Sequence, residues 1–157
     1  MKDIFIDTNI VKNFNNPLDP EYKKLITWLQ HTKGPTIPKE EQAHLVISQK
    51  LLNEYNRSCG TQLGATNILI LIALLQREGR LNNINQKLVD DFRQRHFTAR
   101  IESKLQCNNE DRKLIPVVLL SHRKMALTLD QNFSKDLFAF RGYTPTVASR
   151  PEKLPYQ

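Results

Sequence analysis

The sequence has few cysteines, few glycines and no long apolar run, and each shortage excludes a class of protein. Only Cys59 and Cys107 are present, whereas a disulfide scaffold or a thiolate zinc site needs several closely spaced cysteines. Five glycines and eight prolines in 157 residues are too few for a low-complexity chain. The longest apolar run, residues 68–75, is far shorter than the ~18 residues that suggest a membrane span. No signal-peptide core follows Met1, so we expect a soluble, cytoplasmic protein.

The length and the charge of the chain indicate the number of domains and the kind of partner. A chain of 157 residues without repeats or linkers predicts a single domain at residues 1–148, followed by a loose C-terminal tail at residues 149–157. Lys and Arg number 23 against 16 Asp and Glu, which gives a net charge of +7. A basic surface favours a polyanionic partner, and nucleic acid is the commonest one.

The hydrophobic periodicity predicts strands that alternate with helices. Strands are expected at 3–6, 44–47, 124–129 and 144–148, with a short one at 99–103. Helices are expected at 21–31, after Ser48, at 62–78, near 88–96, from 109 and at 133–140. The centre of the helix at 62–78 is apolar on every side, so it is buried all round or partly in an oligomer interface. Pro116 interrupts the helix that begins at Asn109, and a kink or an early start is expected there. The alternation predicts an α/β fold with a mainly parallel central sheet flanked by helices.

Two of the expected strands end in an aspartate, namely Asp7 and Asp130. Ligands of open α/β sheets bind at the carboxyl ends of the strands, so two acids placed there are candidates for one site. Glu54 lies early in the helix after the second strand, and Asp111 lies in the first turn of the helix from Asn109. Both helices are expected to start at the same edge of the sheet.

Each of these acids also has an ordinary structural explanation. Asp7 and Asp130 suit helix caps or turns, Asp111 suits the positive end of a helix, and Glu54 suits a solvated helix face. Together they are less ordinary, because carboxylates crowded in one cleft repel one another unless a cation lies among them. Oxygen ligands select Mg²⁺ or Mn²⁺, and such an ion on a basic protein suits attack on a phosphodiester.

The order and spacing of these segments resemble those of the PIN-domain nucleases. The matching segments are Ile4-Phe5-Ile6-Asp7-Thr8-Asn9, Ser48 with Glu54-Tyr55, Asp111 with Leu114-Ile115, and Leu127-Thr128-Leu129-Asp130-Gln131-Asn132-Phe133. The resemblance runs from Lys2 to about Ala148. It implies a three-layer fold and a metal-dependent endoribonuclease that uses Mg²⁺ or Mn²⁺.

The resemblance also implies roles for individual residues. The acidic quartet that holds the metal and is catalytic would be Asp7, Glu54, Asp111 and Asp130, supported by the polar groups of Thr8 or Asn9, Thr128 and Asn132. Many small stand-alone PIN proteins are toxins of toxin–antitoxin pairs and form dimers. An antitoxin protein and a homodimer are therefore the implied partners besides RNA.

Several positions depart from the family pattern or leave a choice open. Glu110 competes with Asp111 as the third acid, and Asp111 is favoured because the apolar residues that follow it turn its face toward the core. Asp136 lies near Asp130 but is expected on the outer side of its helix. For RNA, the densest basic stretch carries Arg93, Arg95 and Arg100, and the next candidates are Lys12, Lys23 and Lys24.

Other chemistries find little support in the sequence. It contains neither a phosphate-binding P-loop, nor a dinucleotide fingerprint, nor a hydrolase nucleophile elbow, and its four histidines lack metal-ligand spacing. The main alternative is a PIN-like domain that binds RNA or a protein partner without cutting. A receiver-like phosphotransfer domain ranks lower, because only Asp7 stands where such a domain needs an acidic pair.

Overall fold

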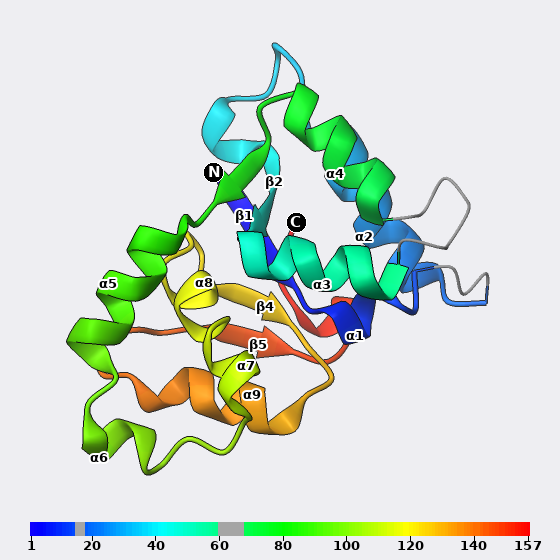
Figure 1. The fold of residues 1–157 in the computed structure, drawn as a ribbon. Helices are drawn as coiled ribbons and strands as arrows, with labels where there is room; N and C mark the ends of the chain where they lie inside the picture. Colours follow the sequence, from blue (N-terminus) through cyan, green and yellow to red (C-terminus); the bar gives the residue numbers. More distant parts are fainter. Residues whose placement is uncertain (15–17, 60–67) are drawn as a thin grey trace.

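A five-stranded parallel sheet forms the centre of the protein (Figure 1), in a computed structural model that describes residues 1–14, 18–59 and 68–157. The strands are β1 (Lys2–Ile6), β2 (Ala43–Ile47), β3 (Leu81–Asn83), β4 (Met125–Leu127) and β5 (Thr146–Ala148). Their order is β3-β2-β1-β4-β5, and every neighbouring pair is parallel. The predicted α/β class with a central parallel sheet is confirmed.

Helices cover both faces of this sheet, which gives three layers (Figure 1). The chain moves outward from β1 to β3 and then crosses back to β4 and β5, and right-handed crossovers place the two sets of helices on opposite faces. One set comprises α2 (Pro20–His31), α3 (Gln49–Cys59) and α4 (Ile68–Arg77). The other comprises α5 (Gln86–His96), α6 (Ala99–Glu102), α7 (Asn109–Arg112), α8 (Ile115–Leu119) and α9 (Gln131–Asp136). The shorter helices are α1 (Thr8–Val11), η1 (Lys39–Glu41), η2 (Leu137–Ala139) and η3 (Pro151–Lys153).

The core is continuous because the central strands are apolar and buried on both faces. Ile4, Phe5 and Ile6 of β1 are fully buried, as expected for a parallel strand between two helical layers. Asp3 and His44 interrupt the apolar pattern, but both are hydrogen bonded. Within the described ranges, no buried side-chain nitrogen or oxygen lacks a partner.

In the layer formed by α5 to α9, a proline divides one helix into two. The helix expected from Asn109 is split into α7 and α8, and Pro116 is at the second position of α8. Proline has no backbone N–H to donate to the carbonyl of residue 112, so α7 ends there. The predicted interruption at Pro116 is confirmed, and so is the start of this helix, where Asn108 accepts a hydrogen bond from the backbone N–H of Asp111.

Two other expected elements differ from the structure. The strand predicted at 99–103 is wrong, because these residues form α6, which is capped by the hydroxyl of Thr98. Strand β3 was not predicted, since Leu81–Asn83 is a short edge strand with two asparagines and little burial. Of the helix predicted at 62–78, residues 62–67 lie outside the described part. The remainder, α4, exposes 54% of Ile70, so this helix is not buried all round. None of the helices in the described part is long and apolar enough to cross a bilayer.

The C-terminal residues, expected to be loose, pack against the domain. Leu154 and Tyr156 are buried, and the Tyr156 ring meets the Trp28 ring edge-on with centroids 5.0 Å apart. The guanidinium of Arg123 donates to the Tyr156 carbonyl at 2.8 Å. Its prolines and lysines predicted a loose tail, but Tyr156 packs on Trp28 of α2, and η3 also contacts that helix.

Candidate active site

The strand order reverses between β1 and β4, which is where open α/β sheets bind ligands. Asp7 directly follows β1, and Asp130 is the third residue after β4, which ends two residues earlier than expected. The hydroxyl of Thr128 donates to Asp7 Oδ2 at 2.7 Å and accepts from the backbone N–H of Asp130 at 3.1 Å. One threonine therefore joins the two strand ends.

Asp7 is held firmly by this edge of the sheet. Besides Thr128, it accepts from the backbone N–H of Thr8 at 2.7 Å on Oδ1 and from the Asn9 amide at 3.3 Å on Oδ2. Asn9 in turn accepts from the backbone N–H of Leu129 at 3.1 Å. A carboxylate offers about four acceptor positions, so three donors leave one open toward the crevice.

Glu54 approaches the same edge from α3, the helix that Ser48 caps by accepting from the backbone N–H of Leu51. The Thr8 hydroxyl donates to Glu54 Oε2 at 3.3 Å. The Lys50 ammonium lies 3.1 Å from the other oxygen, Oε1. Helices α1 and α3 pack against each other. Glu54 is thus placed at the site by its own helix and by the residue after Asp7.

Asp111 and Glu110 are adjacent in sequence but face different surroundings. Glu110 is 64% exposed in its side chain and pairs with Lys50 at 2.7 Å and with Lys113 at 3.0 Å. These two lysines lower the pKa of Glu110 to about 2. Asp111 instead lies close enough to the carboxylates of Asp130 and Glu54 to feel their charges. Of the two acids, only Asp111 faces the other members of the quartet.

The pKa values of two acids, Asp7 and Asp111, are raised above their ordinary value. Burial raises the pKa of Asp7, and the charges of Glu54 and Asp111 raise it further, against the hydrogen bonds from Thr128 and Thr8. Burial likewise raises the pKa of Asp111, and the carboxylates of Asp130 and Glu54 raise it further, against the charge of Lys50 and the hydrogen bond with Asn108. Crowded acids with raised pKa values are typical of functional sites, because folding alone gains nothing from the repulsion.

Asp130 also has a structural role, as the simpler interpretation expected. Its carboxylate accepts from the backbone N–H of Phe133 at 3.0 Å and so caps α9. Asp7 similarly precedes α1 as its cap. Asn132 is exposed in α9, and in the described ranges no hydrogen bond joins it to an acid of the quartet. Thr8, Asn9 and Thr128 therefore contact the acids, and Asn132 does not.

The four carboxylates are the type of ligand that a hard divalent cation prefers, but their side chains lie too far apart to coordinate one ion. Their carboxylate oxygens retain open acceptor positions and repel one another, which a bound Mg²⁺ or Mn²⁺ would relieve. Among the described residues, no three His, Cys, Asp or Glu side chains lie close enough together to hold a metal ion. A metal would therefore require side-chain movement, and Lys50 and Thr8 hold one of the four side chains, Glu54.

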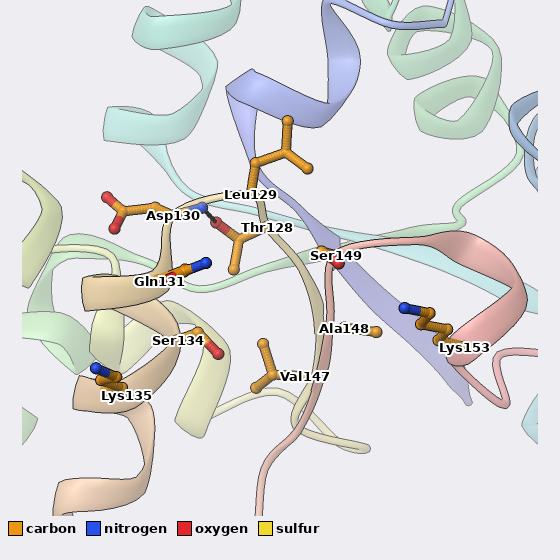
Figure 2. A pocket seen from close by; sticks show the side chains of 10 residues that line it. All are labelled: Thr128, Leu129, Asp130, Gln131, Ser134, Lys135, Val147, Ala148, Ser149 and Lys153. Atoms are coloured by element: carbon orange, nitrogen blue, oxygen red, sulfur yellow. Dashed lines mark hydrogen bonds between the residues drawn. The ribbon is translucent and has the colours of Figure 1, made fainter.

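Two hollows lie on either side of the acids. A cleft of about 450 Å³ between α3, α5 and α7 is lined by Lys50, Arg57, Arg93, Lys113, Asp90 and Glu110, among others. On the other side, a hollow of about 440 Å³ lies between α9 and the chain after β5. Figure 2 shows Lys135 and Lys153 on opposite sides of this second hollow and the Asp130 carboxylate pointing away from Lys153. Lysines or arginines therefore line both hollows, the first together with Asp90 and Glu110 and the second together with Asp130.

The predicted RNA-contacting residues are separated by the structure. Arg93 lines the α3/α5/α7 cleft, with its guanidinium 5.4 Å from the centre of the Phe97 ring. Arg95 is exposed on α5 and Arg100 on α6, and neither is among the residues that line the cleft. Lys50 was not singled out from the sequence. Its only signal was the spacing of four residues from Glu54, which places both side chains on one helix face.

The position expected for Asp136 is wrong. It is 3% exposed, and its carboxylate accepts from the backbone N–H groups of Gln106 and Cys107 at 2.8–2.9 Å. This aspartate faces inward and fixes the loop before α7. Burial and the nearby Asp136 raise the pKa of the Cys107 thiol to about 12, so this cysteine stays protonated.

Comparison with protein-family models and with curated proteins finds no match to this chain. The resemblance to PIN-domain nucleases therefore stays a prediction from the residues quoted above. The fold class is established by the coordinates, whereas the activity is a matter for proposal.

Proposed function

We propose that this protein is a metal-dependent endoribonuclease of the PIN type. The observation that supports this most is that four acids from separate segments lie near the edge where the strand order reverses, and that their charges raise the pKa values of two of them; the four are Asp7, Glu54, Asp111 and Asp130. None of these acids has an arginine or lysine partner except Glu54, as far as the described residues go. Repelling carboxylates in a partly buried site are best explained by a cation that they bind.

The proposed chemistry follows from the residues at this edge. Asp7, Glu54, Asp111 and Asp130 would hold Mg²⁺ or Mn²⁺, which when bound supplies Lewis-acid activation of water and stabilises charge on the phosphate. Thr128 and the backbone of Thr8 orient the Asp7 carboxylate. Asn9 ties the turn after β1 to the turn after β4 through the backbone of Leu129. These contacts hold the site before substrate arrives.

RNA is the proposed substrate because lysines or arginines line the hollows on both sides of the acids. Arg93, Arg95 and Arg100 would contact phosphates without reading sequence, and Arg93 lies in the cleft that adjoins Lys50. Within the same proposal, the protein acts in the cytoplasm and its partner is an antitoxin. A homodimer belongs to the same proposal, and light scattering of wild type and of Ile70→Lys, which changes an exposed apolar side chain of α4, would test it.

The experiment uses two neighbouring acids as a matched pair. Cleavage of an unstructured RNA is measured with saturating Mn²⁺ and with EDTA for wild type, Asp111→Asn and Glu110→Gln. Asp111→Asn should lose cleavage by at least about a hundredfold, since it removes a ligand of the catalytic ion. Glu110→Gln should retain most of it, because Glu110 pairs with two lysines outside the quartet. Metal-independent cleavage, or equal activity in both variants, would contradict the proposal.

One observation favours a second candidate, a PIN-like domain that binds RNA or protein without cutting. Glu54 is already neutralised by Lys50, and the described acids are not gathered to ligand distance. In that case wild type would bind RNA without cleaving it at any Mn²⁺ concentration. Asp7→Asn would then bind RNA at least as tightly, since removing a negative charge favours a polyanion.

A further inference from the structure

Lys50 occupies an unfavourable place in its helix. Ser48 caps α3, so Lys50 is the second residue of the first turn, where the positive end of the helix dipole disfavours a cation. Its side chain is only 20% exposed. The surroundings of Lys50 must offset both effects, and the neighbouring carboxylates do so.

The Lys50 ammonium bridges two acids, of which one is a member of the quartet and the other is not. It lies 3.1 Å from Glu54 Oε1, inside the quartet, and 2.7 Å from Glu110 Oε2, outside it. The other oxygen of Glu110 is 3.0 Å from Lys113. The four side chains form an alternating row of charges that ends on Glu54. Of the two lysines, only Lys50 contacts an acid of the quartet.

We propose that Lys50 is the resident counter-cation of the acidic cluster, and that a divalent cation must displace it from Glu54 to complete the site. This rests on the proposed function, because it takes Glu54 as a metal ligand. An ammonium on Oε1 occupies an acceptor position of that oxygen and repels an approaching dication. Lys50 is thus a positioning residue that acts through Glu54.

Glu110 allows Lys50 to leave Glu54 with only a small movement of its side chain. After leaving Glu54, Lys50 keeps its partner on Glu110 and remains on the wall of the α3/α5/α7 cleft. Its charge is then free to face a phosphate in that cleft. Glu110 therefore draws Lys50 away from the quartet, and the two acids compete for one ammonium. This competition predicts opposite effects of removing Lys50 and removing Glu110 on metal affinity.

The test measures Mn²⁺ binding to the full chain by titration calorimetry, without RNA. Lys50→Met keeps the length of the side chain but removes its charge, and should bind Mn²⁺ on the order of tenfold tighter than wild type. Lys113→Met is the matched control, since it also removes a cation from Glu110 but does not touch Glu54. Its Mn²⁺ affinity should change by less than about twofold, as expected for an exposed pair. Lys50→Arg keeps the charge and should bind Mn²⁺ no tighter than wild type.

A double-mutant cycle separates this role from the possibility that Glu110 is itself a ligand. Glu110→Gln alone should weaken Mn²⁺ binding, because Lys50 then forms an ion pair with Glu54 only. In the Lys50→Met background the same change should have no effect, since no ammonium remains to be shared. Weakening of equal size in both backgrounds would make Glu110 a metal ligand and overturn the role assigned to Lys50.

The remaining outcomes distinguish this inference from the proposed function. If wild type, Lys50→Met and Lys113→Met all bind Mn²⁺ with equal affinity, the role assigned to Lys50 is wrong, but the metal site remains. Absence of Mn²⁺ binding from wild type, Lys50→Met and Asp7→Asn alike would remove the metal site and both proposals with it. Binding that appears only in Lys50→Met would support the displacement directly.

Discussion

The two ends of strand β1 carry aspartates in opposite circumstances. Asp3, at the amino end, is fully buried and accepts hydrogen bonds from the Asn82 amide and from the backbone N–H groups of His122 and Arg123, at 2.7–2.9 Å. Asp7, at the carboxyl end, is only partly buried, yet other carboxylates face it. Three residues of one strand, Ile4, Phe5 and Ile6, therefore separate an acid surrounded by hydrogen-bond donors from an acid that faces other acids.

The comparison teaches how to tell a structural acid from a candidate functional one. Asp3 connects β1 to the edge strand β3 and to the turn before β4, so its charge serves the fold. Asp136 follows the same pattern, since its carboxylate is occupied by two backbone N–H groups. At Asp7 the hydrogen bonds orient a carboxylate that the neighbouring charges disfavour. Burial by itself marks neither role; the sign of the neighbouring charges does.

The largest expected effect is on cleavage. Asp7→Asn preserves the shape of the side chain but removes a metal-binding charge, so activity should fall by about a thousandfold or more. Asp3→Asn should leave the rate of the folded enzyme within a few fold of wild type, because Asp3 lies at the far end of the strand. The measurement is the initial rate of RNA cleavage at saturating Mn²⁺, normalised to the folded fraction. Equal losses in both variants would erase the distinction between the two ends.

Stability should show the reverse order. Asp3→Asn replaces an acceptor oxygen with an amide nitrogen beside buried backbone donors, and should reduce the free energy of unfolding by about 3 kcal/mol. Asp7→Asn should raise it by up to about 1 kcal/mol without metal, since it relieves a like-charge cluster. Urea unfolding in EDTA provides both values. A destabilised Asp7→Asn would mean that its hydrogen bonds outweigh the repulsion.

The pH dependence sharpens the same contrast. Because the pKa of Asp7 is raised above its ordinary value of 3.8, the folded chain binds the extra proton and loses stability as pH rises through that window. The advantage of Asp7→Asn over wild type should therefore be absent below about pH 3.8 and grow toward pH 7. Asp19 supplies the control, since its hydrogen bond with Arg150 lowers the pKa of Asp19. The loss of stability in Asp19→Asn should likewise grow as pH rises. Unfolding curves in EDTA between pH 3 and pH 8 test both slopes.

Much of this site could be predicted from the sequence, because strand ends can be read from it. The apolar runs before Asp7 and Asp130 indicate buried strands, and parallel strands bring their carboxyl ends to one edge. Glu54 and Asp111 follow from their position early in helices that start at that edge. Local patterns thus sufficed for the residues at the carboxyl end.

The amino end could not be predicted in the same way. Asp3 takes its donors from residues about 80 and 120 positions away, and no local pattern marks them. Strand β3 was missed for a related reason, since Asn82 looks like a loop residue until it pairs with Asp3. The role of Lys50 was also hidden, because its second partner, Glu110, lies 60 residues along the chain.

The smallest expected effect concerns RNA affinity at the two ends of the sheet. Arg93→Ala with Arg95→Ala should weaken binding of unrelated single-stranded RNAs by about the same factor, on the order of tenfold, and reduce the dependence of affinity on salt. Lys39 and Arg77 are exposed at the amino end, so the double variant Lys39→Ala with Arg77→Ala removes the same charge elsewhere. If RNA lies across the carboxyl edge, this control should change affinity by less than about threefold, since only long-range attraction is lost.

The assay is fluorescence anisotropy of a labelled RNA in EDTA between 50 and 300 mM salt, which excludes cleavage during the measurement. Because Arg93 lines the cleft and Arg95 does not, the single variants refine the result: Arg93→Ala should account for most of the loss. Equal losses in the two double variants would mean that RNA responds to net charge alone. If only Arg95→Ala reduces RNA affinity, the RNA lies on the outer face of α5, away from Lys50 and the acids.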